Sequence, residues 1–273
     1  MKRKERNEKR NAILGTLYAT LIYIIFYIPV IVMITFSFNN AKRNFAWEGF
    51  TTSWYTKLFS FENTTLWDAL IYSLMIAVLA TLISVIIGVL GAFGLSKFEF
   101  KAKKFINGMI FVPIIVPEIV LAVAMLIIFI TLHIKLGMVT ILIGHCTFCI
   151  PYTVVTIKGR ISGDNETLQE ASMDLGANRI QTFFRVTIPS IMPGIISAAF
   201  LSFTLSIDDV VMSNMLAGAS QSTLPVLILS LNRTGLSGDV NALTTIMIAL
   251  MVVGILINEL IQKLKANKGR RFS

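Results

Sequence analysis

The sequence predicts an all-α integral membrane protein with six transmembrane helices. The chain has 273 residues, of which 55% are hydrophobic and 14% are charged, and this balance is too apolar for an ordinary soluble domain. A hydrocarbon layer about 30 Å thick requires roughly 20 apolar residues in a helix, because a helix pairs its own backbone groups. Six such segments occur, at Leu14–Phe36, Ala69–Leu95, Phe105–Leu132, Leu136–Ile157, Ile188–Ile207 and Ala242–Leu264.

The distribution of Lys and Arg predicts that both termini are cytoplasmic. If the chain starts inside and crosses six times, 19 of the 24 basic residues lie on the cytoplasmic side and five lie outside. Cytoplasmic loops of membrane proteins carry such an excess. The net charge of +9 is then explained by topology and contact with the lipid bilayer, and no nucleic-acid-binding module accompanies it. Without a linker, residues 1–273 are expected to form one transmembrane domain.

Local residue patterns predict close packing for the second segment and a break in the third, and they leave the end of the fifth open. Gly88 and Gly91 in the second segment allow helix backbones to approach closely. Pro113 and Pro117 in the third segment remove backbone donors, so a broken helix is expected there. Irregular backbone at membrane depth is tolerated where it lines a cavity or is buried in protein. An extension of the fifth segment through Val210–Gly218 stays open.

Three acidic residues near the predicted spans are candidates for lining a solute path. A carboxylate inside a bilayer is costly and is a functional candidate by default. Glu118 lies past the midplane if counted along a helix from the cytoplasmic side, and Asp208 and Asp209 end the fifth segment. Adjacent residues do not share a helix face, so we expect at most one aspartate to face the path. The alternatives are a buried carboxyl, paired or protonated within the bundle, for Glu118 and a helix-end cap or solvated turn for the aspartates.

Two uncharged residues extend this candidate path. Ser206 is expected to supply a neutral hydrogen bond near the aspartates. Trp54 would provide a cation–π wall, although an aromatic anchor at the membrane interface is the alternative.

Cysteine and histidine do not predict a metal or catalytic site. Cys146 and Cys149 are neighbours on one helix face, and we interpret them as small apolar residues. His133 and His145 are isolated in the sequence, so no Ser/His/Asp set is expected and the chain is not predicted to be an enzyme.

The most informative motif lies in the predicted cytoplasmic loop of about residues 158–187. Glu170, Ala171 and Ser172 are followed by Gly176 and, after a further interval, by Pro189. Asp164 or Asn165 would cap a helix through Glu170, and Gly176 would end it. Ala177–Arg185 would form a second short helix. This spacing resembles the loop by which membrane subunits of ABC importers bind their ATPase, and we call it the coupling loop. An amphipathic loop without a partner is the alternative.

The resemblance implies a type I ABC importer permease fold and transport driven by another polypeptide. A dimer of ATP-binding subunits is then expected to bind at the coupling loop. The residues expected to make or shape this contact are Glu170, Ala171, Ser172, Gly176 and Pro189. No Gly-x-x-x-x-Gly-Lys-Ser/Thr motif occurs in this chain, so ATP and Mg²⁺ are expected on the ATPase partner and no cofactor on this chain.

Further segments resemble the permeases of spermidine/putrescine importers. They include Gly49–Tyr55, Pro117–Val120, Ser206–Val211, Thr223–Pro225 and Asp239–Ile246. The resemblance implies a polyamine importer in a bacterial plasma membrane, with a second related permease and an extracytoplasmic polyamine-binding protein. The alternatives are an ABC permease for another small solute and an ion-driven secondary transporter, although the latter predicts inverted repeats and none is visible.

Overall fold

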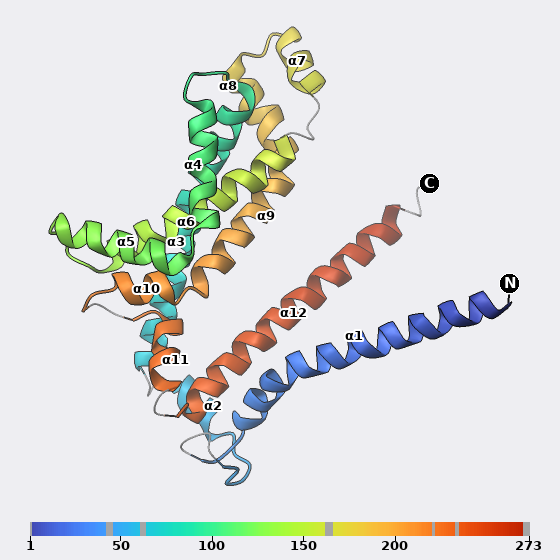
Figure 1. The fold of residues 1–273 in the computed structure, drawn as a ribbon, viewed down its shortest axis with the longest axis vertical. Helices are drawn as coiled ribbons and strands as arrows, with labels where there is room; N and C mark the ends of the chain where they lie inside the picture. The colour runs from blue at the N-terminus through green and yellow to red at the C-terminus, as the bar shows by residue number, and fades with distance from the viewer. Residues whose placement is uncertain are drawn as a thin grey trace. The chain divides into compact units, whose positions relative to one another are not determined.

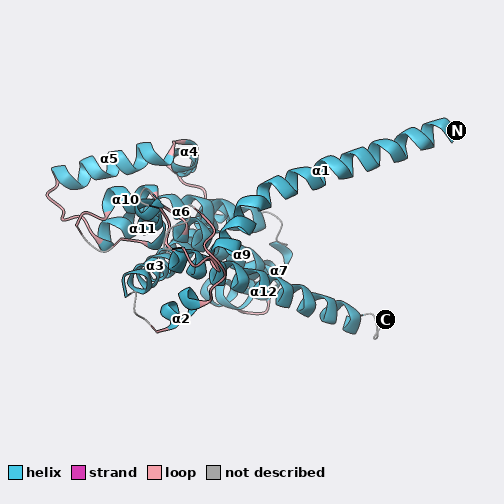
Figure 2. Cartoon of the chain, turned by 90° about the horizontal axis from the view of Figure 1, so that it is seen from below, coloured by secondary structure: helices cyan, strands magenta, loops and turns pink. Residues whose placement is uncertain are grey.

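The computed structural model describes residues 2–41, 46–60, 64–161, 166–219, 222–232 and 235–269. Within these ranges the chain consists of helices and connecting loops, and its one β-bridge is an isolated pair between Asn39 and Phe50 (Figure 2). The all-α prediction is therefore confirmed for the part of the chain that is described.

The chain divides into two compact units, Met1–Thr64 with Ser230–Ser273, and Thr65–Leu229. The first unit contains α1 (Lys2–Phe36), α2 (Ser53–Phe59) and α12 (Gly238–Gly269). Apart from Thr64 and residues 230–232 at two helix ends, the second unit contains the remaining helices (Figure 1). They are α3 (Thr64–Lys97), α4 (Lys103–Ile115), α5 (Glu118–Thr131), α6 (Met138–Ile161), α7 (Glu166–Asp174), α8 (Arg179–Thr182), the π-helical turn η1 (Phe183–Thr187), α9 (Ile188–Ile207), α10 (Val211–Leu216) and α11 (Leu224–Asn232).

Among the described residues, four helices are long and apolar enough to cross a membrane, at Asn11–Phe36, Thr64–Lys97, Met138–Ile161 and Arg179–Ile207. A fifth crossing is counted if α4 and α5 form one span, although they are bent by 108° at a short break. The third predicted segment is thus broken as expected. Gly238–Gly254 in α12 is a shorter apolar stretch, and the count of six spans stays a prediction.

The second unit has a core along α6, the most buried of these crossing helices. One cluster joins α3, α6 and α9 around Val154, Ile157 and Ile191. Another joins α3, α5, α6 and α10 around Ile141, Met212 and Leu216. Cys149 is fully buried in the second cluster, as its interpretation as a small apolar residue predicts.

Small residues permit the close approach of α3 to α6. A Cβ atom added at Gly88 would lie 2.3 Å from Cγ2 of Thr153, and one at Gly91 would lie 3.4 Å from Cγ2 of Val154. The packing role predicted for these two glycines is therefore confirmed.

The first unit is held together by α2. The Trp54 indole Nε1–H donates to the Asn39 carbonyl at 2.7 Å, and the ring packs so closely on Gly238 that a Cβ atom there would clash with it. The apolar side chains of α1 are largely exposed within this chain. A surface of that kind requires lipid or a partner helix to cover it.

Candidate functional site

The second unit contains an acidic cavity of about 520 Å³ at the break between α4 and α5. Its walls come from the ends of α4 and α9, the start of α5, the middle of α6 and the start of α10. The lining residues are Pro113, Ile114, Val116, Glu118, Leu121, Phe148, Tyr152, Leu205, Asp208, Asp209, Val210 and Val211. All three acidic candidates from the sequence therefore meet in one cavity, and this described lining contains no Lys or Arg.

Pro117 determines where the third predicted segment breaks. A residue that precedes proline is pushed out of the helical region, and Val116 is extended, with ψ of 133°. Pro113, by contrast, lies inside α4. The new helix α5 starts at Glu118, where a carboxylate is favourable because helix N-termini carry partial positive charge. The break thus places the first carboxylate at the cavity wall.

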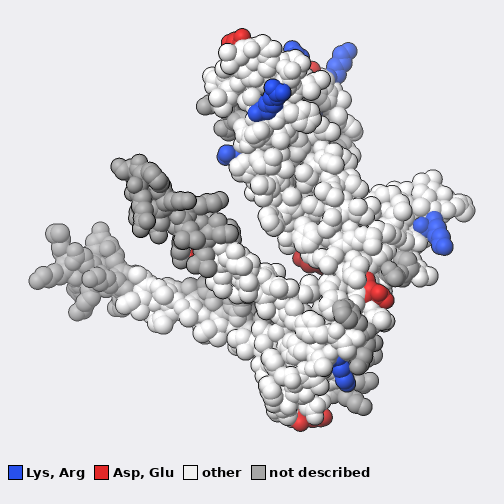
Figure 3. All heavy atoms as spheres, turned by 180° about the vertical axis from the view of Figure 1, so that it is seen from behind, with Lys and Arg blue, Asp and Glu red and all other residues white. Residues whose placement is uncertain are grey.

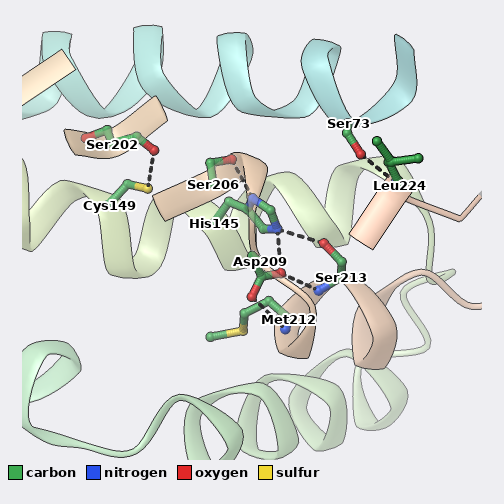
Figure 4. Close-up of polar contacts among 9 residues, drawn as sticks. All are labelled: Ser73, His145, Cys149, Ser202, Ser206, Asp209, Met212, Ser213 and Leu224. Carbon is green, nitrogen blue, oxygen red and sulfur yellow. Dashed lines mark hydrogen bonds and ion pairs between the residues drawn. The ribbon is translucent and has the colours of Figure 1, made fainter. Parts of the chain in front are cut away.

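Asp209 lies in the break between α9 and α10 and is only 6% exposed. Its Oδ2 accepts the backbone N–H of Ser213 at 2.8 Å and lies 3.1 Å from Nε2 of His145. Its Oδ1 accepts the backbone N–H of Met212 at a longer 3.2 Å. Figure 4 shows Oδ2 facing the imidazole and Oδ1 turned away from it. His145 and the start of α10 therefore hold this carboxylate in one orientation.

The neighbouring Asp208 is placed differently. It is the C-cap residue of α9 and is exposed, whereas Asp209 is buried. The two acids separate because α9 ends at Ile207 and the chain turns before α10. An unbroken fifth span through Val210–Gly218, one of the options left open by the sequence, is therefore wrong, and Asp209 is the more constrained of the two.

Ser206 and Trp54 make other contacts than those expected of them. Ser206 is not among the residues that line the cavity, and its Oγ lies 2.6 Å from Nδ1 of His145. Trp54 lies in the first unit, where Nζ of Lys57 sits 5.0 Å from its ring centroid. Contact of either residue with a solute stays a prediction.

His145 is the site residue that sequence reasoning missed. It looked isolated, yet it is fully buried and contacts Ser206, Asp209 and Ser213. These partners lie more than 60 residues further along the chain, so no local spacing signals them. Ser206, His145 and Asp209 are the residue types of a hydrolase triad. Their placement relative to the cavity, however, is the opposite of what a hydrolase requires. The aspartate faces the cavity, whereas the serine, which would be the nucleophile, is buried behind the histidine.

The coupling loop begins with residues 158–161 at the end of α6, and Asp164 and Asn165 lie outside the described residues. The helix α7 follows. The helix contains Glu170, which is exposed, and ends at Asp174. Gly176 follows with φ of +87°, a conformation that costs little only for glycine. The N–H of Ala177 then bonds to the carbonyl of Ser172 at 3.1 Å. The turn predicted at Gly176 is confirmed.

A second short helix follows, as expected, and leads into α9. Asn178 caps α8 in a reciprocal pair of hydrogen bonds with Gln181. Ser172 Oγ lies 3.2 Å from the hydroxyl of Thr182 and so connects α7 to α8. The chain continues through η1 to Pro189 in the first turn of α9, where a proline is tolerated because no backbone donor is needed.

Apolar side chains project from the coupling loop. Leu175 is 90% exposed and Ile180 is 70% exposed, and Leu168 and Phe184 are exposed as well. Basic side chains gather at the same end of the second unit (Figure 3), where the Lys158 ammonium donates to the Asn107 side chain at 2.9 Å. Exposed apolar residues with a polar rim are typical of a protein interface.

Comparisons with known proteins identify the family to which this chain is similar. Residues 84–268 match the family described as "Binding-protein-dependent transport system inner membrane component". The chain is 40% identical over 254 residues to the spermidine/putrescine transport system permease protein PotC of Haemophilus influenzae, covering 93% of this chain and 96% of that protein. It is 35% identical over 236 residues to the putrescine transport system permease protein PotI of Escherichia coli, covering 84% and 83%.

Solved structures show the same fold at low sequence identity. A bacterial ABC transporter involved in the import of the acidic polysaccharide alginate matches with a TM-score of 0.67 and 16% identity, over 94% of this chain and 97% of that one. The MetNI methionine ABC transporter matches with a TM-score of 0.56 and 16% identity, over 77% and 97%.

These matches agree with the coupling loop and with the apolar helices of the fold. The relatives are permease subunits, which are transport components and not enzymes. This chain therefore belongs to the family of inner membrane components of binding-protein-dependent transport systems, with the type I ABC permease fold.

Proposed function

We propose that this chain is a membrane permease subunit of an ATP-driven importer that moves polyamines, spermidine or putrescine, into the cell. The observation that carries the proposal is the acidic cavity, where Glu118, Asp208 and Asp209 meet without a basic residue in the described lining. Walls of one charge favour a solute of the opposite charge. The names of the similar permeases PotC and PotI support the same substrate class.

The size and chemistry of the cavity suit a flexible polycation. Its volume of about 520 Å³ lies within the usual range of small-molecule sites, roughly 300–1,000 Å³. Phe148 and Tyr152 add aromatic faces to the lining, and aromatic rings attract ammonium groups. The fold alone does not select the solute, since a structure with a TM-score of 0.67 belongs to an alginate importer.

The proposed assembly has four kinds of component. This chain crosses the inner membrane six times with both termini in the cytoplasm, an orientation favoured by the 19 of 24 basic residues that it places on that side. It pairs with a second related permease, a dimer of ATP-binding subunits that holds ATP and Mg²⁺, and an extracytoplasmic polyamine-binding protein. The exposed apolar side chains of the coupling loop support docking of the ATPase there.

The proposed mechanism is alternating access. The binding protein delivers the polyamine to the outer mouth, and closure of the ATPase dimer displaces the coupling loop. Because η1 continues directly into α9, and α9 ends beside Asp208 and Asp209, the displacement has a continuous helical connection to the cavity. Reorientation of the helices around the cavity then releases the solute inward.

Uptake of labelled spermidine by vesicles that contain the assembled importer tests this function. Wild-type uptake is expected to require ATP and to fall with Glu170→Ala. Glu99→Ala, at an exposed residue that pairs with Lys103 outside the coupling loop, is the matched control and should leave uptake unchanged. ATP-dependent transport of another solute with spermidine ignored would overturn the substrate. Uptake without ATP would overturn the importer mechanism.

A further inference from the structure

His145 is buried beside the acidic cavity without lining it, and both of its ring nitrogens are engaged. Nδ1 lies 2.6 Å from Oγ of Ser206, and Nε2 lies 3.1 Å from both Oδ2 of Asp209 and Oγ of Ser213. The ring therefore connects α6 with the end of α9 and the start of α10. A fully buried imidazole with this many polar contacts has one fixed orientation.

The hydrogen-bond partners indicate which ring nitrogen of His145 donates to Asp209. An ionised carboxylate can only accept, so the nitrogen that faces Asp209 is the donor. Ser206, with a hydroxyl that both donates and accepts, can then donate to Nδ1. In this arrangement the single Nε2–H is shared between Oδ2 of Asp209 and Oγ of Ser213, and the carboxylate keeps a donor from the ring.

The two oxygens of Asp209 are consequently unequal. Oδ2 lies 3.1 Å from Nε2 of His145 and accepts the N–H of Ser213, while Oδ1 accepts the longer bond from the N–H of Met212. Figure 4 shows Oδ1 pointing away from the imidazole. Asp209 also interacts with Glu118, which lines the same cavity.

We propose that His145 is a positioning residue that holds Oδ2 of Asp209 and so presents Oδ1 to a cationic group of the solute. The inference rests on the proposed polyamine function, and it assigns the cation-binding geometry to a residue that does not touch the solute. Without the Nε2–H donor the carboxylate loses its side-chain anchor and turns away from the position that pairs with Glu118. The importer then closes on a poorly held solute and hydrolyses ATP without moving it.

Three substitutions at His145 separate this role from simple packing. His145→Gln places an uncharged N–H donor near the position of Nε2. His145→Asn places a donor near Nδ1, where it reaches Ser206 and not Asp209. His145→Leu fills the space without any donor. His133→Asn is the control at the other histidine, which is exposed and already has a positive φ of 55°, a conformation that asparagine tolerates.

The measurement is the number of spermidine molecules imported per ATP hydrolysed by the full importer in vesicles, with assembly and binding-protein-stimulated ATPase activity recorded for each variant. A packing defect lowers assembly, uptake and ATPase activity together. We expect His145→Leu and His145→Asn to assemble and to hydrolyse ATP, but to import about tenfold less spermidine per ATP, as loss of a hydrogen bond to a charged group implies. His145→Gln should restore the ratio to within about twofold of wild type, and His133→Asn should match wild type.

The outcomes distinguish this inference from the proposed function. If wild type imports spermidine and His145→Leu keeps the wild-type ratio, the positioning role is overturned and the polyamine function stands. A ratio for His145→Gln as low as that for His145→Leu would also overturn it, because the donor would not be the property that matters. If wild type imports no spermidine, the proposed function fails first and the inference fails with it.

Discussion

Asp209 and Leu175 lie in the same compact unit, yet the first side chain is 6% exposed and the second is 90% exposed. The solute proposed for the acidic cavity is a flexible polycation, so the protein must supply the positioning of the charged groups. His145 and two backbone N–H groups do so for Asp209. The coupling loop meets another protein, and its apolar side chains are left for that partner to cover.

Because of this difference, we expect substitutions at the two sites to impair transport in different ways. In the cavity, a change that leaves the chain folded alters charge or orientation and reduces transport per ATP. In the coupling loop, a change at the exposed surface removes the partner, and transport and ATP hydrolysis stop together. The following substitutions test that difference.

The largest effect is expected at the coupling loop from Leu175→Asp. It places a charge on the most exposed of the apolar side chains named on this loop, and loss of an interface hot spot commonly costs about 2 kcal/mol or more. The ATPase subunits should be lost from the purified complex, as measured by co-purification. Leu175→Met keeps the surface apolar and should retain them. Normal ATPase recovery with the aspartate would show that this surface does not dock the ATPase.

An intermediate effect is expected in the cavity from Glu118→Gln. The amide replaces one of the carboxyl groups that line the cavity, and a hydrogen bond to a charged group contributes about 1.5–3 kcal/mol. Spermidine uptake per ATP should fall roughly tenfold while the ATPase subunits stay bound. Glu48→Gln, at an exposed residue of the other unit, should change neither quantity. If Glu118→Gln lost the ATPase subunits, the claim that the cavity and the coupling loop have separate roles would be contradicted.

The smallest effect is expected from Gly176→Ala. The backbone at Gly176 has φ of +87°, and a residue with a Cβ atom pays roughly 1–2 kcal/mol there. The turn after α7 should loosen, and maximal ATP-dependent uptake should fall by a few fold with the ATPase still bound. Gly159→Ala is the matched control, because its Cβ atom would meet nothing within 4 Å. Equal behaviour of the two variants would show that the turn does not matter for coupling.

The same contrast explains how much the sequence could predict. The coupling loop is local, so the spacing of Glu170, Gly176 and Pro189 was sufficient to predict two short helices and a glycine turn. The break at Pro117 was predictable for the same reason, since proline acts on its immediate neighbours. Its bend of 108° depends on packing against α6 and α10 and had no local signal.

Contacts between distant segments were only partly predictable. The acidic residues were found because charge is rare in apolar segments. Their meeting in one cavity, however, required α4, α5, α9 and α10 to be placed in space. His145 appeared isolated because Ser206, Asp209 and Ser213 come from other helices. The pairing of Gly88 with Thr153 is similar, because small residues indicate that a helix packs closely without indicating against what.

The most direct test of the account compares Asp209→Asn with Asp208→Asn in the assembled importer. The two residues are adjacent and chemically identical, but only Asp209 is buried and held by His145. Labelled spermidine imported per ATP hydrolysed should fall at least tenfold for Asp209→Asn and less than threefold for Asp208→Asn, with equal assembly. Equal losses for the two variants, or wild-type transport by Asp209→Asn, would contradict the claim that the fixed Asp209 carboxylate contacts the solute.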